Sequence, residues 1–128
     1  QNKNIQIIIL SAPDNFQSAI TMVKQMALNY VEVGYNTDKI LDVAALINHL
    51  DLIITPDTSI AHIASAFNKP VVTIHENNQD SFHLFAPISS LNRTVFSKSK
   101  SGINDFSVSL LLQYCVELIS LKIEEEYE

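Results

Sequence analysis

Glycine and basic residues are scarce in this sequence, and each shortage excludes a class of protein. Only two glycines are present, Gly34 and Gly102. No Gly-x-Gly-x-x-Gly segment follows the first apolar run, which argues against a dinucleotide-binding dehydrogenase. Lys and Arg number 8 against 14 acidic residues, for a formal net charge of -6. Because nucleic-acid binding depends on clustered positive charge, we expect no nucleic-acid partner.

Cysteine and long apolar runs are scarce as well. The single cysteine, Cys115, has no partner for an internal disulfide and falls in an apolar helical stripe, so we expect a buried thiol in a reducing compartment. The apolar runs fall far short of the roughly 20 residues that cross a bilayer. No secretory signal pattern stands at the start. The sequence therefore predicts neither a transmembrane segment nor secretion.

What is present is a regular alternation of strand and helix signals over 128 residues, enough for a single domain spanning 1–128. Strands are expected at residues 5–10, 30–35, 52–55, 71–74 and 95–96, and helices at 19–27, 40–47, 60–67 and 108–119. For residues 76–93 the sequence predicts a loop. This order predicts an α/β fold: a Rossmann-like three-layer domain with a right-handed parallel sheet of at least four strands.

Residues 51–64 carry the strongest functional signal, because an apolar strand runs directly into polar residues that open a helix. Asp57, Thr58 and Ser59 follow the strand, at the edge where parallel sheets bind ligands. A helix N-terminus offers unpaired N–H groups and a positive partial charge, which suits an anion such as a nucleotide phosphate. The carboxylate of Asp57 suits a hydroxyl instead. Thr58 and His62 lie four residues apart and share one helix face.

The order Asp-Thr-x-x-x-His, short helix, Lys69-Pro70 and apolar strand resembles the ADP-heptose:lipopolysaccharide heptosyltransferases of glycosyltransferase family 9. The resemblance covers residues 5–120, and its specific part is residues 51–74. It implies that the chain is the C-terminal, donor-binding half of a GT-B glycosyltransferase. The implied reaction is inverting transfer of a sugar from a nucleotide donor, ADP-heptose, to a lipopolysaccharide core or a related glycan.

The resemblance also implies the site. Its donor-binding residues would be Asp57, Thr58, Ser59 and His62, with Asp14 on the ribose hydroxyls. The family's catalytic base is an aspartate of the N-terminal domain, so no catalytic residue is expected in this chain, which should bind without turnover. The expected partners are a nucleotide sugar, the missing N-terminal acceptor-binding domain and a glycolipid acceptor, in the cytoplasm or at the inner membrane face. No cofactor or metal is expected, because helix N-termini and basic side chains can neutralise the leaving diphosphate.

Two departures from the family pattern keep a second hypothesis open. Ser59 stands where the family has glycine, and His75-Glu76-Asn77 stands where it commonly has Gly-Pro-Thr. They indicate either a different donor sugar or a Rossmann-like binding or interaction module with a decayed donor site. Simpler roles are open too: Asp57 or Thr58 as a helix N-cap, His62 as a surface residue, and Asp14 as a turn residue.

Overall fold

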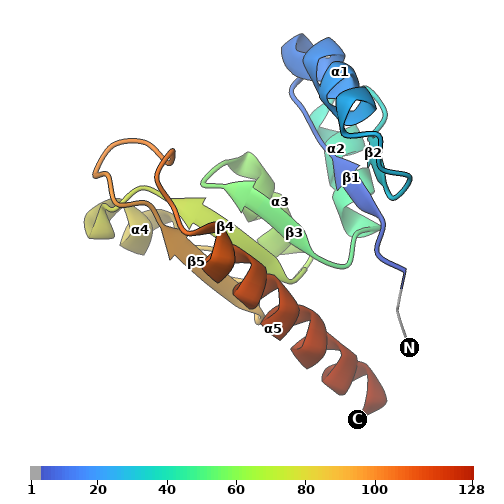
Figure 1. The fold of residues 1–128 in the computed structure, drawn as a ribbon. Helices are drawn as coiled ribbons and strands as arrows, with labels where there is room; N and C mark the ends of the chain where they lie inside the picture. The colour runs from blue at the N-terminus through green and yellow to red at the C-terminus, as the bar shows by residue number, and fades with distance from the viewer. Residues whose placement is uncertain (1–3) are drawn as a thin grey trace. The chain divides into compact units, whose positions relative to one another are not determined.

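The computed structural model describes residues 4–128 (Figure 1). The chain divides into two compact units, Gln1–Val43 and Ala44–Glu128. Among residues 4–128 all strand pairs are parallel, and they form two sheets, one of two strands and one of three. The α/β class with alternating strands and helices is confirmed. The expected sheet of at least four strands differs, because periodicity locates strands but does not specify which distant strands pair.

The first unit is a strand–helix–strand element. It contains β1 (Ile7–Ile9), the short 3-10 helix η1 (Pro13–Asn15), α1 (Phe16–Met26) and β2 (Val31–Val33). β1 and β2 pair in parallel from Ile7↔Val31 to Ile9↔Val33. α1 ends before Asn29, as predicted. The residue after its last turn, Ala27, adopts the left-handed conformation with φ 52°.

The second unit carries the larger sheet. α2 (Ile40–Asn48) spans the boundary and leads to β3 (Ile53–Pro56), α3 (Ser59–Ala66), β4 (Val71–His75), α4 (Gln79–Phe85), β5 (Asn92–Phe96) and α5 (Val108–Tyr127). The sheet order is β3-β4-β5, so each strand lies beside the next in the sequence. Each connection runs through a helix, as parallel neighbours require.

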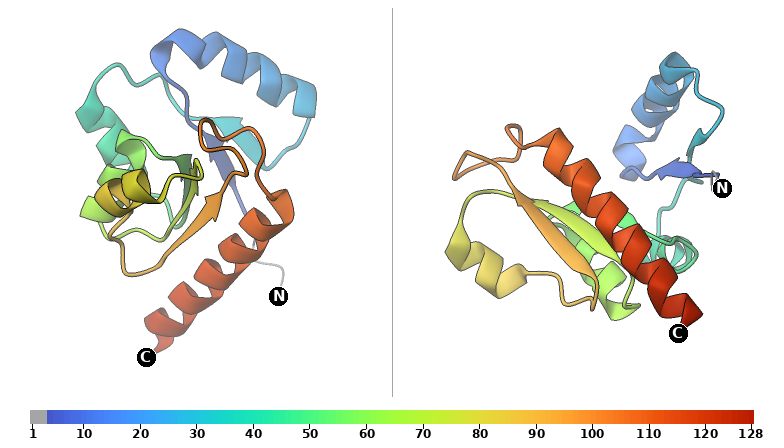
Figure 2. Two further views of the ribbon diagram at one scale, coloured as in Figure 1. Left: turned by 90° about the vertical axis from the view of Figure 1, so that its left-hand side faces the viewer. Right: turned by 60° about the horizontal axis from the view of Figure 1, so that its bottom comes forward.

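β4 is the centre of this unit, and all five of its residues are buried. On one face Val72 and Val95 pack against Cys115 and Leu118 of α5. On the other face lies α3, whose buried residues are Ala61 and Ala64. The ribbons show α3 and α5 on opposite sides of the sheet (Figures 1 and 2). The second unit therefore has the three-layer arrangement that the sequence predicted.

The helix faces differ in part from the predicted ones. The spacing of apolar residues in α3 predicts a core face of Ile60, Ile63, Ala64 and Phe67. Ala64 is buried and the two isoleucines are half-buried, but Phe67 is 43% exposed, and Ala61, which was not predicted, is buried. Small side chains let the helix backbone approach the sheet closely, so the two alanines take the most buried positions of α3.

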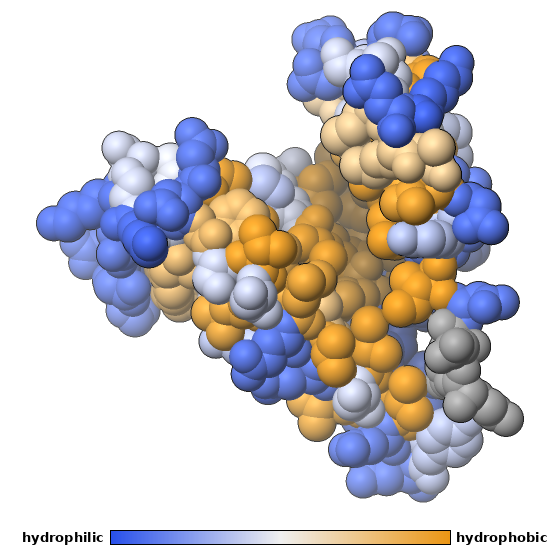
Figure 3. All heavy atoms as spheres, viewed as in Figure 1, coloured by the Kyte–Doolittle hydropathy of each residue, from blue (hydrophilic) through white to orange (hydrophobic). Residues whose placement is uncertain are grey.

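α5 buries Cys115, as predicted, together with Leu118, but leaves other apolar residues exposed. Val108, Leu112 and Val116 are 58%, 59% and 65% exposed. Figure 3 shows apolar side chains along α5 in this view. Within the described residues no helix has both the length and the hydropathy to span a bilayer.

α4 was not predicted, because residues 76–93 read as a loop. Its N-cap is Asn78, whose side chain accepts a hydrogen bond from Ser81 N at 3.1 Å. A helix of seven residues offers too few turns for an apolar period to be recognised.

Candidate nucleotide-sugar site

The N-terminus of α3 begins directly after β3, and Thr58 forms its cap. The Thr58 backbone is extended, at φ -142° and ψ 176°, and its Oγ1 accepts a hydrogen bond from Ile60 N at 3.3 Å. The same oxygen lies 3.1 Å from Oγ1 of Thr55, at the end of β3. The N-capping role considered for this position is confirmed for Thr58.

Two backbone donors at this turn are open. Asp57 N donates to Ile74 O at 3.2 Å and continues the strand pairing, and Ala61 N donates to Thr58 O at 3.0 Å. Within residues 4–128 no partner is found for the N–H groups of Thr58 and Ser59. Unpaired N–H groups at the positive end of a helix form a site for an anion.

The other end of α3 is closed by a Schellman motif. Asn68 has φ 52°, Asn68 N donates to Ser65 O at 2.9 Å, and Lys69 N donates to Ala64 O at 2.8 Å. Asn68 Oδ1 also accepts from Ser90 N at 2.8 Å. The Asn68-Lys69-Pro70 segment therefore stops the helix and turns the chain into β4. This turn brings the ends of β3 and β4 to the same edge of the sheet.

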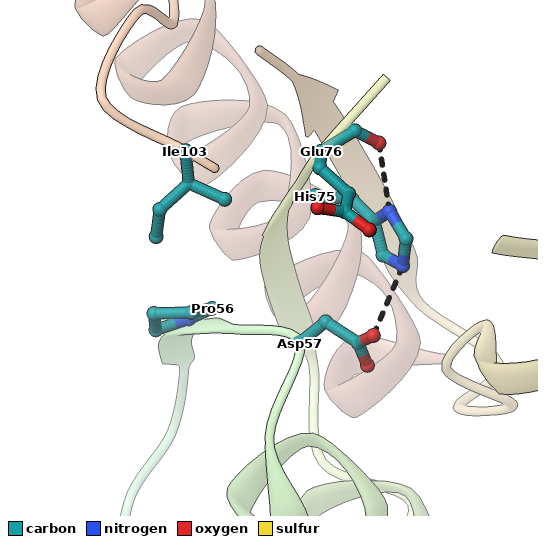
Figure 4. Close-up of a pocket in the computed structure, with 5 residues that line it drawn as sticks. All are labelled: Pro56, Asp57, His75, Glu76 and Ile103. Atoms are coloured by element: carbon teal, nitrogen blue, oxygen red, sulfur yellow. Dashed lines mark hydrogen bonds and ion pairs between the residues drawn. The ribbon is translucent and has the colours of Figure 1, made fainter. Parts of the chain in front are cut away.

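A hollow of about 320 Å³ lies at that edge, lined by Pro56, Asp57, His75, Glu76 and Ile103 (Figure 4). His75 is only 2% exposed, and its Nδ1 lies 2.8 Å from the carbonyl oxygen of Glu76. Because a carbonyl only accepts, Nδ1 must be the protonated nitrogen that donates. The carbonyl therefore fixes both the tautomer and the direction of the ring.

The second ring nitrogen, Nε2, lies 3.0 Å from Asp57 Oδ2. The distance is that of an ion pair, but the two atoms do not align as a hydrogen bond. Nε2 is buried and has no hydrogen-bond partner among the described residues. Phe82 packs edge-on at 5.6 Å from the His75 ring, and Phe96 is tilted at 6.2 Å, both between centroids. These rings hold the imidazole in place.

A loop of residues 98–105 forms the remaining wall. Gly102 N donates to Glu76 Oε2 at 3.2 Å, and Ser97 Oγ donates to Gly102 O at 2.7 Å. Gly102 has φ 94°, which disfavours any residue with a Cβ. Asn77 N also donates to Ser99 O at 2.8 Å. This tethering places Ile103 opposite the polar residues of the hollow.

The structure brings four of the five predicted donor residues together on one segment. Asp57, Thr58 and Ser59 form the turn, and His62 lies exposed on α3 one turn later. Asp14 lies exposed in η1 of the first unit, and its approach to the turn stays a prediction. The contact of any of these residues with a donor also stays a prediction.

Sequence reasoning assigned no role to His75, Glu76 or Ile103. The signal for the first two was the departure from Gly-Pro-Thr, which marked the position without giving its chemistry. Ile103 joins the hollow only through the folding of its loop. In the described part of the chain, no group of three or more His, Cys, Asp or Glu residues is arranged to hold a metal ion.

Comparison with known proteins gives a family and a fold. A family model for glycosyltransferase family 9 (heptosyltransferase) matches residues 1–111. The solved structure of E. coli ADP-heptose LPS heptosyltransferase II is similar, with a TM-score of 0.72 at 17% identity. The match covers 91% of this chain and 37% of that one, so the chain spans little more than a third of the E. coli enzyme. No curated protein sequence matches. On the family match over most of its length, the chain belongs to glycosyltransferase family 9, the heptosyltransferase family.

Proposed function

We propose that this chain binds the nucleotide-sugar donor of a glycosyltransferase at the N-terminus of α3. The observation that carries the proposal is the pair of open N–H groups of Thr58 and Ser59 at the carboxyl end of a parallel strand. Two such donors and the helix dipole suit the diphosphate. The family match supports this reading, since the segment from β3 to β4 lies within it.

Each predicted residue has a distinct part in this proposal. The Thr58 and Ser59 N–H groups and the exposed His62 bind the diphosphate, His62 by donating a hydrogen bond from its ring. Asp57 accepts from a sugar hydroxyl, because a carboxylate repels phosphate. Asp14 accepts from the ribose hydroxyls.

The reaction we propose is inverting transfer of a heptose from ADP-heptose to a lipopolysaccharide core or related glycolipid. The catalytic base is an aspartate of a separate N-terminal acceptor-binding domain, so the chain alone binds without turnover. No metal takes part, because helix N–H groups and basic side chains neutralise the leaving diphosphate. The enzyme works in the cytoplasm, at the inner face of the membrane that carries its acceptor.

A second candidate is a Rossmann-like interaction module whose donor site has decayed. Ser59 favours it, because its Cβ limits how closely a diphosphate approaches the backbone. The serine hydroxyl offsets this by supplying one more donor to a phosphate oxygen.

Titration with ADP, followed by NMR, separates the two candidates. We expect a Kd on the order of 0.1–1 mM, because the contacts of a closing second domain are absent. Amide signals of residues 57–62 should move, equally with Mg²⁺ and with EDTA. The module becomes the better hypothesis if ADP at several millimolar leaves these signals in place.

A further inference from the structure

We propose that His75 is a positioning residue for the anion site at the start of α3, an inference that rests on the proposed function. Its imidazole holds the Asp57 carboxylate and offsets its charge, which leaves the N–H groups of Thr58 and Ser59 open to an anion. The contact is internal to the fold, since His75 is 2% exposed and two phenylalanine rings pack at its ring. A ligand in the hollow therefore meets Asp57 and not the buried Nε2.

Both ring nitrogens of His75 face oxygen atoms that only accept (Figure 4). Nδ1 lies 2.8 Å from the carbonyl oxygen of Glu76, and Nε2 lies 3.0 Å from Oδ2 of Asp57. Only a doubly protonated ring presents a proton to each of them. An imidazole is ordinarily a stronger base than a carboxylate, so a proton between Nε2 and Oδ2 belongs to the ring. The geometry therefore matches a buried imidazolium paired with the Asp57 carboxylate.

Without this pairing, the Asp57 carboxylate would compete with an anion for the start of α3. Aspartate is a favoured N-capping residue, and its negative charge is stabilised at a helix N-terminus. Asp57 stands directly before the N–H groups of Thr58 and Ser59. Its carboxylate nevertheless lies against His75, and the side chain that caps α3 is that of Thr58. An uncompensated carboxylate at this turn would also repel a diphosphate, so the imidazolium removes both obstacles.

The first test reads the charge of His75 without any ligand. A long-range ¹H–¹⁵N spectrum distinguishes a doubly protonated imidazole from either neutral tautomer. At about pH 6.5, where an ordinary histidine is half protonated, we expect His75 to be doubly protonated in the wild type and neutral, with its proton on Nδ1, in Asp57→Ala. The exposed His49 is the internal reference. A neutral His75 in the wild type, or one that keeps both protons in Asp57→Ala, would overturn the proposal.

The second test follows ADP affinity through a double-mutant cycle. His75→Gln should weaken ADP binding roughly three- to tenfold, the size of one charge interaction at a partly exposed site. Asp57→Ala should restore the affinity in the double variant, because the competing carboxylate is gone. His49→Gln, the same change at an exposed position after α2, is the matched control and should leave ADP affinity unchanged.

The outcomes separate this inference from the proposed function. If the wild type and His75→Gln bind ADP equally well, the positioning role is overturned and the donor site stands. A loss in His75→Gln that Asp57→Ala does not restore also overturns it. If the wild type binds no ADP, the proposed function fails and the positioning role fails with it. The spectra of the wild type and Asp57→Ala decide the question even if His75→Gln does not fold.

Discussion

His75 at the end of β4 and Asp57 after β3 meet with 3.0 Å between Nε2 and Oδ2, although no local sequence pattern links them. Asp57 is the more accessible partner, with 29% of its side chain exposed. We expect Asp57→Asn to weaken nucleotide-sugar binding by about tenfold, since a hydrogen bond to a charged group contributes about 1.5–3 kcal/mol. ADP affinity should not fall, because the proposed function assigns this carboxylate to a sugar hydroxyl and not to the diphosphate. Calorimetric titration of both ligands checks this, and a parallel loss of ADP binding would contradict it.

His62 should matter for binding and not for folding. It is exposed on α3, away from the buried Ala61 and Ala64. His62→Ala should change the free energy of unfolding by no more than about 0.5 kcal/mol. ADP affinity should fall by about tenfold or more, as one hydrogen bond to a charged phosphate is lost. A variant that melts much earlier yet binds ADP normally would identify a structural histidine and remove His62 from the site.

The side chain of Thr58 caps α3, and two substitutions test what that cap contributes to stability. Thr58→Ala removes the acceptor for Ile60 N and should cost about 1 kcal/mol of folding stability. Thr58→Ser keeps the hydroxyl and should retain most of that stability. Urea denaturation measures both. If the two variants unfold alike, the observed cap contributes nothing measurable.

The core around α5 gives a matched pair within one helix. Leu118 is 0% exposed against β4 and β5, whereas Leu112 is 59% exposed. Leu118→Ala should cost about 2–5 kcal/mol of unfolding free energy because it leaves a cavity. Leu112→Ala should stay within about 0.5 kcal/mol. Similar losses in both variants would mean that the apolar face of α5 around Leu112 is covered in solution.

Burial raises the pKa of the Cys115 thiol in the folded state. The unfolded thiol ionises near pH ~8.5, so above that value protons leave the unfolded chain first. The stability associated with the protonated thiol is therefore present below this pH and is lost as the pH rises toward the folded pKa. We expect the stability difference between wild type and Cys115→Ala to narrow from pH 7 to 10 in urea denaturation. A difference independent of pH would show that the folded thiol ionises normally.

Local sequence patterns located most of the strands and helices and the turn at the start of α3, but not the other residues that line the hollow. The strand-to-helix transition at residues 53–59 could be recognised because capping side chains follow the β-branched residues within a few positions. Asp57, Thr58, Ser59 and His62 are neighbours in the sequence, so finding the segment found the group. The sequence missed α4 because it has only seven residues. It also placed Phe67 in the α3 core face and missed Ala61, since the helical period alone does not tell which apolar residues make the closest contact.

The sequence by itself determined the order of the strands and of every helix except η1 and α4, and the turn that opens α3, because each depends on residues that are close together in the chain. The parallel α/β class followed from the alternation of strands with helical connections. Only the tertiary structure decided that His75 stands beside Asp57 and that Glu76 and Ile103 close the hollow. Those contacts join β4, the β3–α3 turn and the loop after β5, which are distant along the chain. They depend on strand register and on the Gly102 tether to Glu76, and neither leaves a periodic trace in the sequence.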